Sequence, residues 1–348
     1  MSSLPSRARF ESCLLAGALG DAVGYGIEFT RYSEIRRDYG LAPPAGPDLD
    51  GAPPAEISDD TQMTLFTAEG LARYLRGRSE GEDPNFARTM TESLVRWLST
   101  QEAAMEPPEV SWSMGLTEER RLNNQRSPGN TCTSSLRQIA GGGDIPSPDN
   151  PINESKGCGG VMRVAPCGLV AESAEEAFDW GIQSAALTHS HPSGYLAAGY
   201  MAALVWELAR DEYPEEAMET ADELLAGYDE GEEVRQAVDK AVDLAEEGLP
   251  EGPDIKKHIG EGWVAEEALA IALACVLAGS VHSSRGIRET LWHAAAHDGD
   301  SDSTASIAGH LIGAQVDVDG LPDIWLDDLE LREVITDVAD GLHEAASG

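Results

Sequence analysis

Strand signals are almost absent from this chain of 348 residues. No long run alternates apolar and polar residues, and no Asn-Gly or Asp-Gly turn joins two β-branched segments, as hairpins require. Apolar residues instead recur at i, i+3 and i+4 spacing, which is typical of helices that cover a core. Aromatic residues are only 6% of the chain, so Ala, Gly and Leu supply much of its apolar content. The sequence therefore predicts an all-α protein with closely packed helices.

Helices are predicted along most of the chain, with two irregular segments between them. Their expected ranges are 10–19, 63–75, 86–98, 132–140, 174–186, 194–210, 213–226, 232–247, 265–278, 283–296 and 303–314. The first helix is expected to end at the glycine-rich stretch 20–29. Segments 41–54 and 106–155 are rich in loop-forming residues, and a loop as long as the second usually has a function. We expect one domain over residues 1–348, with a core of about residues 10–316 and a C-terminal extension over 317–348.

The charge balance restricts the partners of the protein. Lys and Arg number 24 against 62 Asp and Glu, a formal net charge of −38. These acidic residues are spread through periodic apolar segments, which favours a folded protein over an acidic disordered one. A dense carboxylate surface stays hydrated at high salt, where its self-repulsion is screened, so we expect a halophilic source. The same charge disfavours non-specific nucleic-acid binding, which requires a basic surface.

The cysteines and apolar runs indicate the compartment. The longest apolar stretch, 268–278, is too short to cross a bilayer, so no membrane partner is expected. The N-terminal apolar run is short and interrupted by Glu11, which favours a buried helix over a signal peptide. Five scattered cysteines indicate neither a zinc site nor a disulfide framework. We therefore expect a cytoplasmic protein in a reducing compartment.

Two acidic clusters lie far apart in the sequence, at Ser58-Asp59-Asp60-Thr61 and at Asp300-Ser301-Asp302-Ser303-Thr304. Their carboxylate and hydroxyl oxygens are the ligands that Mg²⁺, Mn²⁺ and Ca²⁺ prefer. Each cluster is explained about as well by an N-cap and acidic residues in a first helical turn. Each also follows an irregular loop and precedes an apolar helix, which favours the metal interpretation. If the fold brings them together, the chain has a binuclear metal site.

Three further motifs have two interpretations each. The glycines of 157–160 would expose backbone N–H groups to a phosphate, or simply form a tight turn. Arg163 would pair with a carboxylate or phosphate of a ligand, or form a structural ion pair. His189 and His191 lack the further His or Cys that a metal pair needs. His189 is as well explained by a structural role at a helix end as by a hydrogen bond to a ligand.

Taken together, these motifs resemble the ADP-ribosylglycohydrolase family, which includes the dinitrogenase-reductase-activating glycohydrolases. Seven separated blocks agree in order and span residues 20–304. They are Gly20-Asp21-Ala22-Val23-Gly24 with Glu28, Ser58-Asp59-Asp60-Thr61, Gly129-Asn130-Thr131, the segment 153–163, Thr188-His189 with His191-Pro192, Gly262-Trp263 with Glu266-Glu267-Ala268, and the segment 299–304. One such block alone would be a weak signal, whereas seven in order are specific.

The resemblance implies a single all-α domain with two Mg²⁺ or Mn²⁺ ions in a central cleft. It implies that six residues bind the ions, namely Ser58, Asp59, Asp60, Asp300, Asp302 and Ser303. Glu28 would lie by the scissile bond, and Gly129, Asn130 and Thr131 would approach the diphosphate. The ADP-ribose pocket would be lined by Ser155, Gly157, Cys158, Gly159 and His189.

The last block departs from the family pattern, Gly-Gly-Asp-Thr-Asp-Thr. Asp298 replaces the first Gly, Ser301 replaces a Thr, and Ser303 replaces the Thr that binds metal. A serine hydroxyl can also coordinate a cation, so we expect activity to be retained. Asp298 is expected to add negative charge close to the ions.

The expected function is a Mg²⁺-dependent hydrolase that cleaves the glycosidic bond between ADP-ribose and a modified protein side chain or another acceptor. Mg²⁺ would orient the ribose hydroxyls and a water, and Glu28, Asp60 and Asp302 would form the catalytic set. The alternatives are a hydrolase of a small-molecule or nucleic-acid ADP-ribose conjugate, and a catalytically silent ADP-ribose-binding relative. We expect the protein to act as a monomer.

Overall fold

The computed structural model describes residues 4–49 and 54–348, and no β-strand occurs in this part of the chain. The α-helices are α1 (Arg7–Tyr25), α2 (Tyr32–Asp38), α3 (Asp59–Ser79), α4 (Phe86–Gln101), α5 (Asn130–Ala140), α6 (Ala165–Val170), α7 (Ala174–Ala186), α8 (Pro192–Leu208), α9 (Pro214–Leu225), α10 (Glu232–Ala245), α11 (Gly252–His258), α12 (Ala265–Ala278), α13 (Ser284–Ala295), α14 (Ser301–Gly313), α15 (Asp323–Asp328) and α16 (Arg332–Ser347). Two short 3₁₀ helices, η1 (Val161–Arg163) and η2 (Val318–Gly320), complete the set. The prediction of an all-α fold is confirmed.

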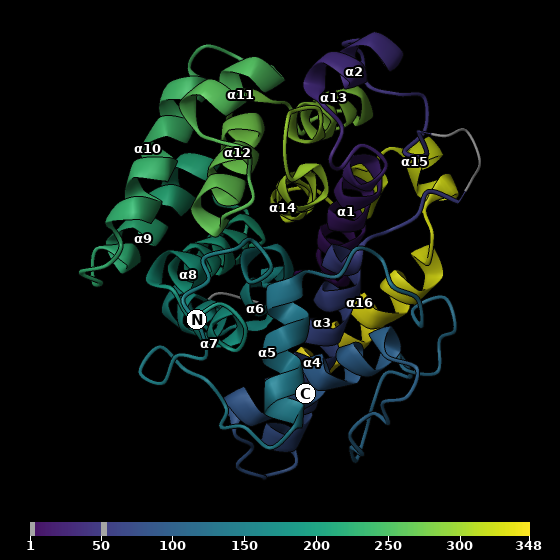
Figure 1. The fold of residues 1–348 in the computed structure, drawn as a ribbon, viewed down its shortest axis with the longest axis vertical. Helices are drawn as coiled ribbons and strands as arrows, with labels where there is room; N and C mark the ends of the chain where they lie inside the picture. Colours follow the sequence, from purple (N-terminus) through teal and green to yellow (C-terminus); the bar gives the residue numbers. More distant parts are fainter. Residues whose placement is uncertain (1–3, 50–53) are drawn as a thin grey trace.

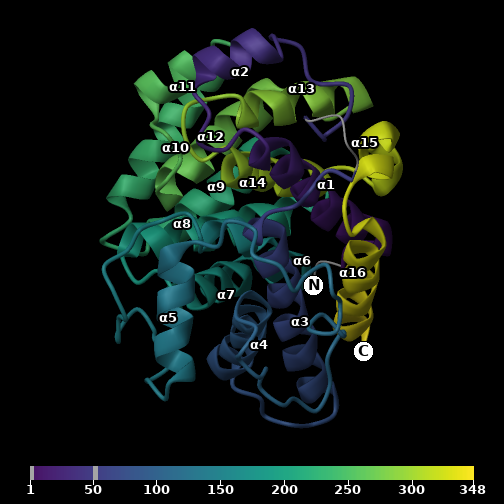
Figure 2. The ribbon, with the colours of Figure 1, turned by 45° about the vertical axis from the view of Figure 1, so that its right-hand side comes forward.

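Helices α1 and α14 form the centre of the molecule, where they lie side by side (Figures 1 and 2). Their backbones approach so closely that only glycine is accommodated at several positions. A Cβ on Gly20 of α1 would lie 1.9 Å from the Ala305 carbonyl oxygen, and one on Gly309 of α14 would lie 2.0 Å from that of Ala16. Small residues on both helices therefore set the distance between the two elements that the other helices surround.

The expected end of the first helix at the glycine-rich stretch was wrong. Helix α1 continues through Gly20 and Gly24 to Tyr25. Glycine is unfavourable in a helix interior, so propensity alone predicts a break there. Here the missing side chains create the space for α14, since a Cβ on Gly24 would lie 2.3 Å from the Ser301 carbonyl oxygen. Tertiary packing therefore overrides the local preference.

The remaining helices pack on both sides of this central pair. Helices α7 to α10 and α12 form one group (Figure 1). Most residues of α8 are buried within it. On the other side, α16 packs against α1 and α3, and α3 packs against α4. Within the segment 317–348, Trp325, Ile335 and Leu342 are fully buried against the same core.

Most predicted helices are present within a few residues of their expected bounds, and the 174–186 and 265–278 ranges match α7 and α12. Helices α2, α6, α11, α15 and α16 were not predicted, because most are too short to show a clear apolar period. Segment 102–129 contains no helix, as expected for part of the long loop. Residues 50–53 of the predicted loop 41–54 lie outside the described residues.

The acidic residues lie mainly on the outer faces of peripheral helices. In α10, Val234, Ala237, Val238, Ala241 and Leu244 are buried at helical spacing, while the acidic side chains lie between them. No described helix is both long and apolar enough to span a bilayer.

We predict that Gly20→Ala destabilises the protein by about 3 kcal/mol or more, because the new methyl group would overlap backbone atoms that cannot rotate away. Gly77→Ala in α3 is the matched control, since a Cβ there lies 3.2 Å from the flexible Glu82 side chain and 3.3 Å from the Pro84 ring, contacts that shifts of a few tenths of an ångström relieve. Alanine is the better helix former, so this control should be close to neutral. Urea unfolding of both variants measures the difference. Equal unfolding free energies would contradict the packing argument.

Candidate active site

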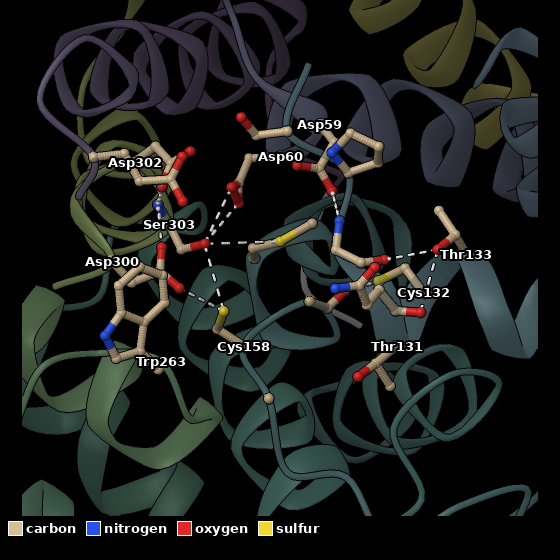
Figure 3. Close-up of a pocket in the computed structure, with 18 of the residues that line it drawn as sticks. Asp59, Asp60, Thr131, Cys132, Thr133, Cys158, Trp263, Asp300, Asp302 and Ser303 are labelled. Atoms are coloured by element: carbon tan, nitrogen blue, oxygen red, sulfur yellow. Dashed lines mark hydrogen bonds between the residues drawn. The ribbon is translucent and has the colours of Figure 1, made fainter. Parts of the chain in front are cut away.

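The two acidic clusters lie at the N-termini of α3 and α14, and the fold brings these two ends together (Figure 3). Ser58 is the N-cap of α3, and its Oγ accepts a hydrogen bond from the Asp60 N–H at 3.1 Å. Asp300 is the N-cap of α14 and accepts from the Ser303 N–H at 3.3 Å. The capping interpretation is therefore correct for both clusters, but it does not exclude the other one. The Ser303 hydroxyl donates to Asp60 Oδ1 at 3.0 Å and joins the clusters directly.

A third carboxylate comes from the turn that follows α1. Oxygen atoms of Glu28, Asp300 and Asp302 all lie within 4.8 Å of one another. Asp300 and Asp302 are each 4% exposed, so the carboxylates of the second cluster are buried and not solvated. Glu28 is half-buried and lies at the edge of this group. The geometry therefore presents several oxygen donors to one small volume.

Asp21 accepts hydrogen bonds from residues of the first cluster, a structural role that was not predicted. Its carboxylate is fully buried in α1 and accepts hydrogen bonds from the Ser58 N–H at 3.0 Å and from the Thr61 N–H at 3.1 Å. The Thr61 hydroxyl also donates to it. A charged residue inside the apolar first helix is the sequence signal that marks this position. Asp21 holds the start of α3 in place.

Burial and mutual repulsion raise the pKa values of these carboxyl groups. Burial is the main cause at Asp59, Asp60 and Asp302, whose pKa values lie well above the ordinary range, and neighbouring carboxylates add to the effect. The pKa of Glu28 is raised to about 8 by burial, then by Asp300 and Asp21. Burial likewise raises the pKa of Asp21 to about 6, although its hydrogen bonds oppose the shift.

This donor set suits a hard divalent cation. Within the described residues, no Lys or Arg forms an ion pair with Asp21, Glu28, Asp59, Asp60, Asp300 or Asp302. Buried charges without a partner are costly, and a bound cation would remove the repulsion between them. The available ligands are carboxylate and hydroxyl oxygens, which Mg²⁺, Mn²⁺ and Ca²⁺ prefer over nitrogen and sulfur donors.

The carboxylates form one wall of a cavity of about 710 Å³. The opposite wall is the start of α5, where Gly129, Asn130 and Thr131 line the space. Figure 3 shows Asp300, Asp302 and Ser303 on one side and Thr131 and Thr133 on the other. The Gly129 N–H donates to Asp59 Oδ2 at 3.3 Å and connects the two walls. The cavity is large enough for a ligand of nucleotide size.

The glycine loop 157–160 forms the floor between these walls. A Cβ on Gly159 would lie 2.7 Å from Cys132 Sγ and 2.8 Å from the His189 ring, so no larger residue is accommodated there. His189 is buried, and its Nδ1 lies 2.9 Å from the Thr188 hydroxyl. Burial, with the nearby Arg163 charge, lowers the pKa of His189 to about 3. His189 is therefore a neutral ring that lines the cavity.

Arg163 forms neither of the pairs considered from the sequence. Its guanidinium is fully buried and donates to the carbonyl oxygens of Gly159 and Ser184 and to the Thr188 hydroxyl. None of its hydrogen bonds to the described residues is to a carboxylate. Arg163 therefore fixes the glycine loop against the segment that carries His189.

The other predicted site residues lie at different depths. Cys158 lines the cavity, and its thiol donates to Asp300 Oδ2 at 2.8 Å. Ser58 is fully buried behind the wall, where it caps α3. Ser155 lies beneath the glycine loop, where its Oγ accepts from the Gly157 N–H at 3.3 Å. Neither serine is among the described residues that line the cavity.

Asp298 does not join the acidic group, contrary to expectation. Its carboxylate accepts from the Tyr32 N–H at 2.7 Å and from Lys256 Nζ at 3.1 Å. Burial alone would raise the pKa of Asp298, but these two contacts outweigh it and lower the pKa. Asp298 lines a separate surface cavity instead. The departure from the family pattern therefore connects the start of α2 to α11.

Several cavity residues had no signal in the sequence. Phe29, Gln101, Gln125 and Arg137 all line the space. Gln101 ends α4, and Gln125 and Arg137 belong to the long loop and to α5. No local motif connects these positions, so only the tertiary structure identifies them.

Comparisons of sequence and of fold relate this chain to known proteins. A sequence profile of the ADP-ribosylglycohydrolase family matches residues 2–348. The human ADP-ribosylhydrolase ARH3 is 25% identical over 97% of this chain and 93% of its own length. The ADP-ribosyl-[dinitrogen reductase] glycohydrolase of Rhodospirillum rubrum is 22% identical over 90% of this chain and 88% of its own. A solved structure described as an ADP-ribosylglycohydrolase-related protein complex has the same fold, with a TM-score of 0.65, 24% identity and 98% coverage of both chains.

The raised pKa of Glu28 predicts how stability depends on pH when no divalent cation is bound. The unfolded chain releases this proton near pH 4.3, whereas the folded chain holds it to about pH 8. Between these values the folded state binds more protons, so its stability falls as pH rises. Thermal unfolding in EDTA at fixed high salt should show this decline. Glu28→Gln should have a shallower decline, and an identical slope in both proteins would contradict the assignment.

Proposed function

This chain belongs to the ADP-ribosylglycohydrolase family, and we propose that it is a divalent-cation-dependent enzyme that releases ADP-ribose from a modified side chain or another acceptor. Enzymes of this family hydrolyse ADP-ribose conjugates. The observation that carries the proposal is the junction of the two acidic clusters, where Ser303 Oγ lies 3.0 Å from Asp60 Oδ1 at one end of the cavity. A helix-capping role alone does not require the two helix ends to meet.

We assign the cation ligands to both clusters. Asp59 and Asp60 from α3 and Asp300, Asp302 and Ser303 from α14 line the cavity, and Ser58 completes the first set from behind. Two Mg²⁺ ions, or Mn²⁺ ions, suit so many carboxylates, because one divalent charge would leave most of the repulsion in place. A bound cation would act as a Lewis acid and lower the pKa of a water molecule.

Glu28 is the group we assign to proton transfer. It follows α1 at the edge of the acidic group, within 4.8 Å of ligand oxygens of Asp300 and Asp302. A carboxyl group there can take a proton from an attacking water or give one to the leaving group. Cleavage at the anomeric carbon develops oxocarbenium character, which the surrounding carboxylates stabilise electrostatically.

The remaining walls would bind ADP-ribose. Backbone N–H groups in the first turn of α5 lack helical partners, and this helix end favours negative charge, so Asn130 and Thr131 are suited to the diphosphate. Gly157 and Gly159 allow close approach of a ligand to the backbone, and neutral His189 offers one ring nitrogen to it. The adenosine end would then extend toward Gln101 and Gln125.

A catalytically silent relative is the second candidate function. Loss of ligand carboxylates would mark such a protein, but all four cluster aspartates and Glu28 line this cavity. A conjugate other than a modified protein remains within the proposal, because the cavity residues named so far recognise ADP-ribose rather than its acceptor.

We predict that Asp60→Asn and Asp302→Asn each abolish ADP-ribose release, and that EDTA does the same to the unaltered protein. Either variant removes a charged ligand from the junction of the clusters. Asp298→Asn is the matched control, because its carboxylate contacts Tyr32 and Lys256 instead. The control should keep the increase in melting temperature that Mg²⁺ or Mn²⁺ produces, whereas the two variants lose it. Full activity in metal-free buffer would contradict the proposed dependence on a divalent cation.

We also predict that Glu28→Gln lowers turnover by about 100-fold, the usual contribution of a general acid or base, with little change in affinity for ADP-ribose. Glu261→Gln is the control, since this carboxylate pairs with Lys256 at 2.7 Å and does not line the cavity. Steady-state rates and calorimetric binding of ADP-ribose separate the two effects. An unchanged rate in Glu28→Gln would remove Glu28 from the mechanism.

A further inference from the structure

Two aromatic rings form an exposed stack at the rim of the cavity. Phe29 and Trp263 have ring centroids 5.4 Å apart at an interplanar angle of 18°. Phe29 is 72% exposed and Trp263 is 38% exposed, although both line the cavity. Large apolar side chains left open beside a cavity point to a ligand that covers them.

The backbone of Phe29 adopts an unfavourable conformation. Its φ of 66° is in the left-handed region, which is rare for a bulky residue without a special reason. Phe29 directly follows Glu28, so the same turn places a carboxylate and an aromatic ring at the rim. Burial does not explain the strained conformation, because most of the ring remains open to solvent. Strain of this kind is concentrated at functional sites.

Trp263 is fixed relative to the acidic group. It lies in the short loop 260–264 between α11 and α12, where Glu261 O accepts from the Asp300 N–H at 2.8 Å. Trp263 O accepts from the Cys158 N–H at 3.3 Å, so loop 260–264 is hydrogen-bonded to the glycine loop as well. Figure 3 shows the Trp263 ring beside Asp300 and away from Thr131 and Thr133. The stack therefore belongs to the end of the cavity where the carboxylates lie.

The two ends of the cavity differ in charge. Arg137 is the only Lys or Arg among the described residues that line it, and it comes from α5 at the end opposite the stack. Arg137 pairs with Glu102, so the free N–H groups at the start of α5 are what favours an anionic diphosphate at this end. The anomeric carbon would then lie by the acidic group, and whatever is attached to it would extend to Glu28, Phe29 and Trp263.

We propose that the Phe29–Trp263 stack binds the acceptor group of the substrate and favours a guanidinium, as in ADP-ribosylated arginine, over a hydroxyl-linked acceptor; this rests on the proposed function. A guanidinium is a planar, delocalised cation that stacks on aromatic faces and pairs with carboxylates, and Glu28 is adjacent to the stack. A hydroxyl-linked acceptor has no cation or π-system to offer these rings.

The reaction is balanced by water alone. The anomeric carbon exchanges its bond to the guanidino nitrogen for a bond to the water oxygen, and a water proton moves to the leaving nitrogen. The released guanidinium remains a planar cation against the aromatic stack. Phe29 and Trp263 are therefore specificity-determining residues that contact the leaving group, not proton-transfer groups.

The test compares Trp263→Ala, the conservative Trp263→Phe and the control Tyr213→Ala, which changes an exposed aromatic residue outside the cavity. Each is assayed in high salt with Mg²⁺ on ADP-ribosyl-arginine and on an ADP-ribosylated serine peptide. We expect Trp263→Ala to lose about tenfold in kcat/KM on the arginine conjugate, consistent with one lost cation–π contact, and to change little on the serine conjugate. Trp263→Phe should recover most of the loss, and Tyr213→Ala should match the unaltered protein.

Binding of free ADP-ribose, which has no acceptor, separates the alternatives. Its affinity should be unchanged in Trp263→Ala. If Trp263→Ala lost as much affinity for ADP-ribose as it loses in kcat/KM on the arginine conjugate, the stack would lie at the adenosine side and the proposal would be overturned. A preference of the unaltered protein for the serine conjugate would also overturn it. Release of ADP-ribose from neither conjugate would contradict the proposed function itself, a result distinct from the other two.

Discussion

The close approach of α1 and α14 is the constraint on which the rest of the structure depends. Gly20 and Gly24 on one helix and Gly309 on the other allow backbone atoms to meet without side chains between them. Because the two helices touch along their length, the C-terminal end of α1 meets the N-terminal end of α14. Asp21 and Glu28 are thereby brought to the acidic cluster that begins at Asp300. A larger residue at these glycines would separate the carboxylates as well as the helices.

The fold concentrates negative charge in a place that also tolerates it. Helices α3 and α14 both direct their N-termini at the acidic group, and the start of α5 faces it across the cavity. Helix N-termini favour anions through their dipoles and free N–H groups, which offsets part of the repulsion. The remaining repulsion would favour the cation binding that we propose. The same features would serve both proposed ligands, with carboxylates for the cations and the start of α5 for phosphate.

The sequence predicted much of this arrangement, because several of its features act locally. Helical periodicity predicted α7 and α12 with correct bounds, and short oxygen-rich motifs marked both clusters. It failed where distant contacts reverse a local preference. Gly20 and Gly24 predicted a helix end, because a local pattern contains no information about their packing against α14. Asp298 was expected close to the cations, but its carboxylate accepts hydrogen bonds from Tyr32 and Lys256 instead.

The sequence by itself therefore determined the all-α class and the family, and it marked the oxygen-rich side chains of the two acidic clusters, since these follow from periodicity and from residue types in order. Only the tertiary structure decided which groups share a volume. It placed Asp21 under Ser58 and Thr61, paired Ser303 with Asp60, and stacked Phe29 on Trp263 at the rim. The physical reason is that these contacts join residues far apart in the chain, and their geometry is set by how closely the helix backbones pack.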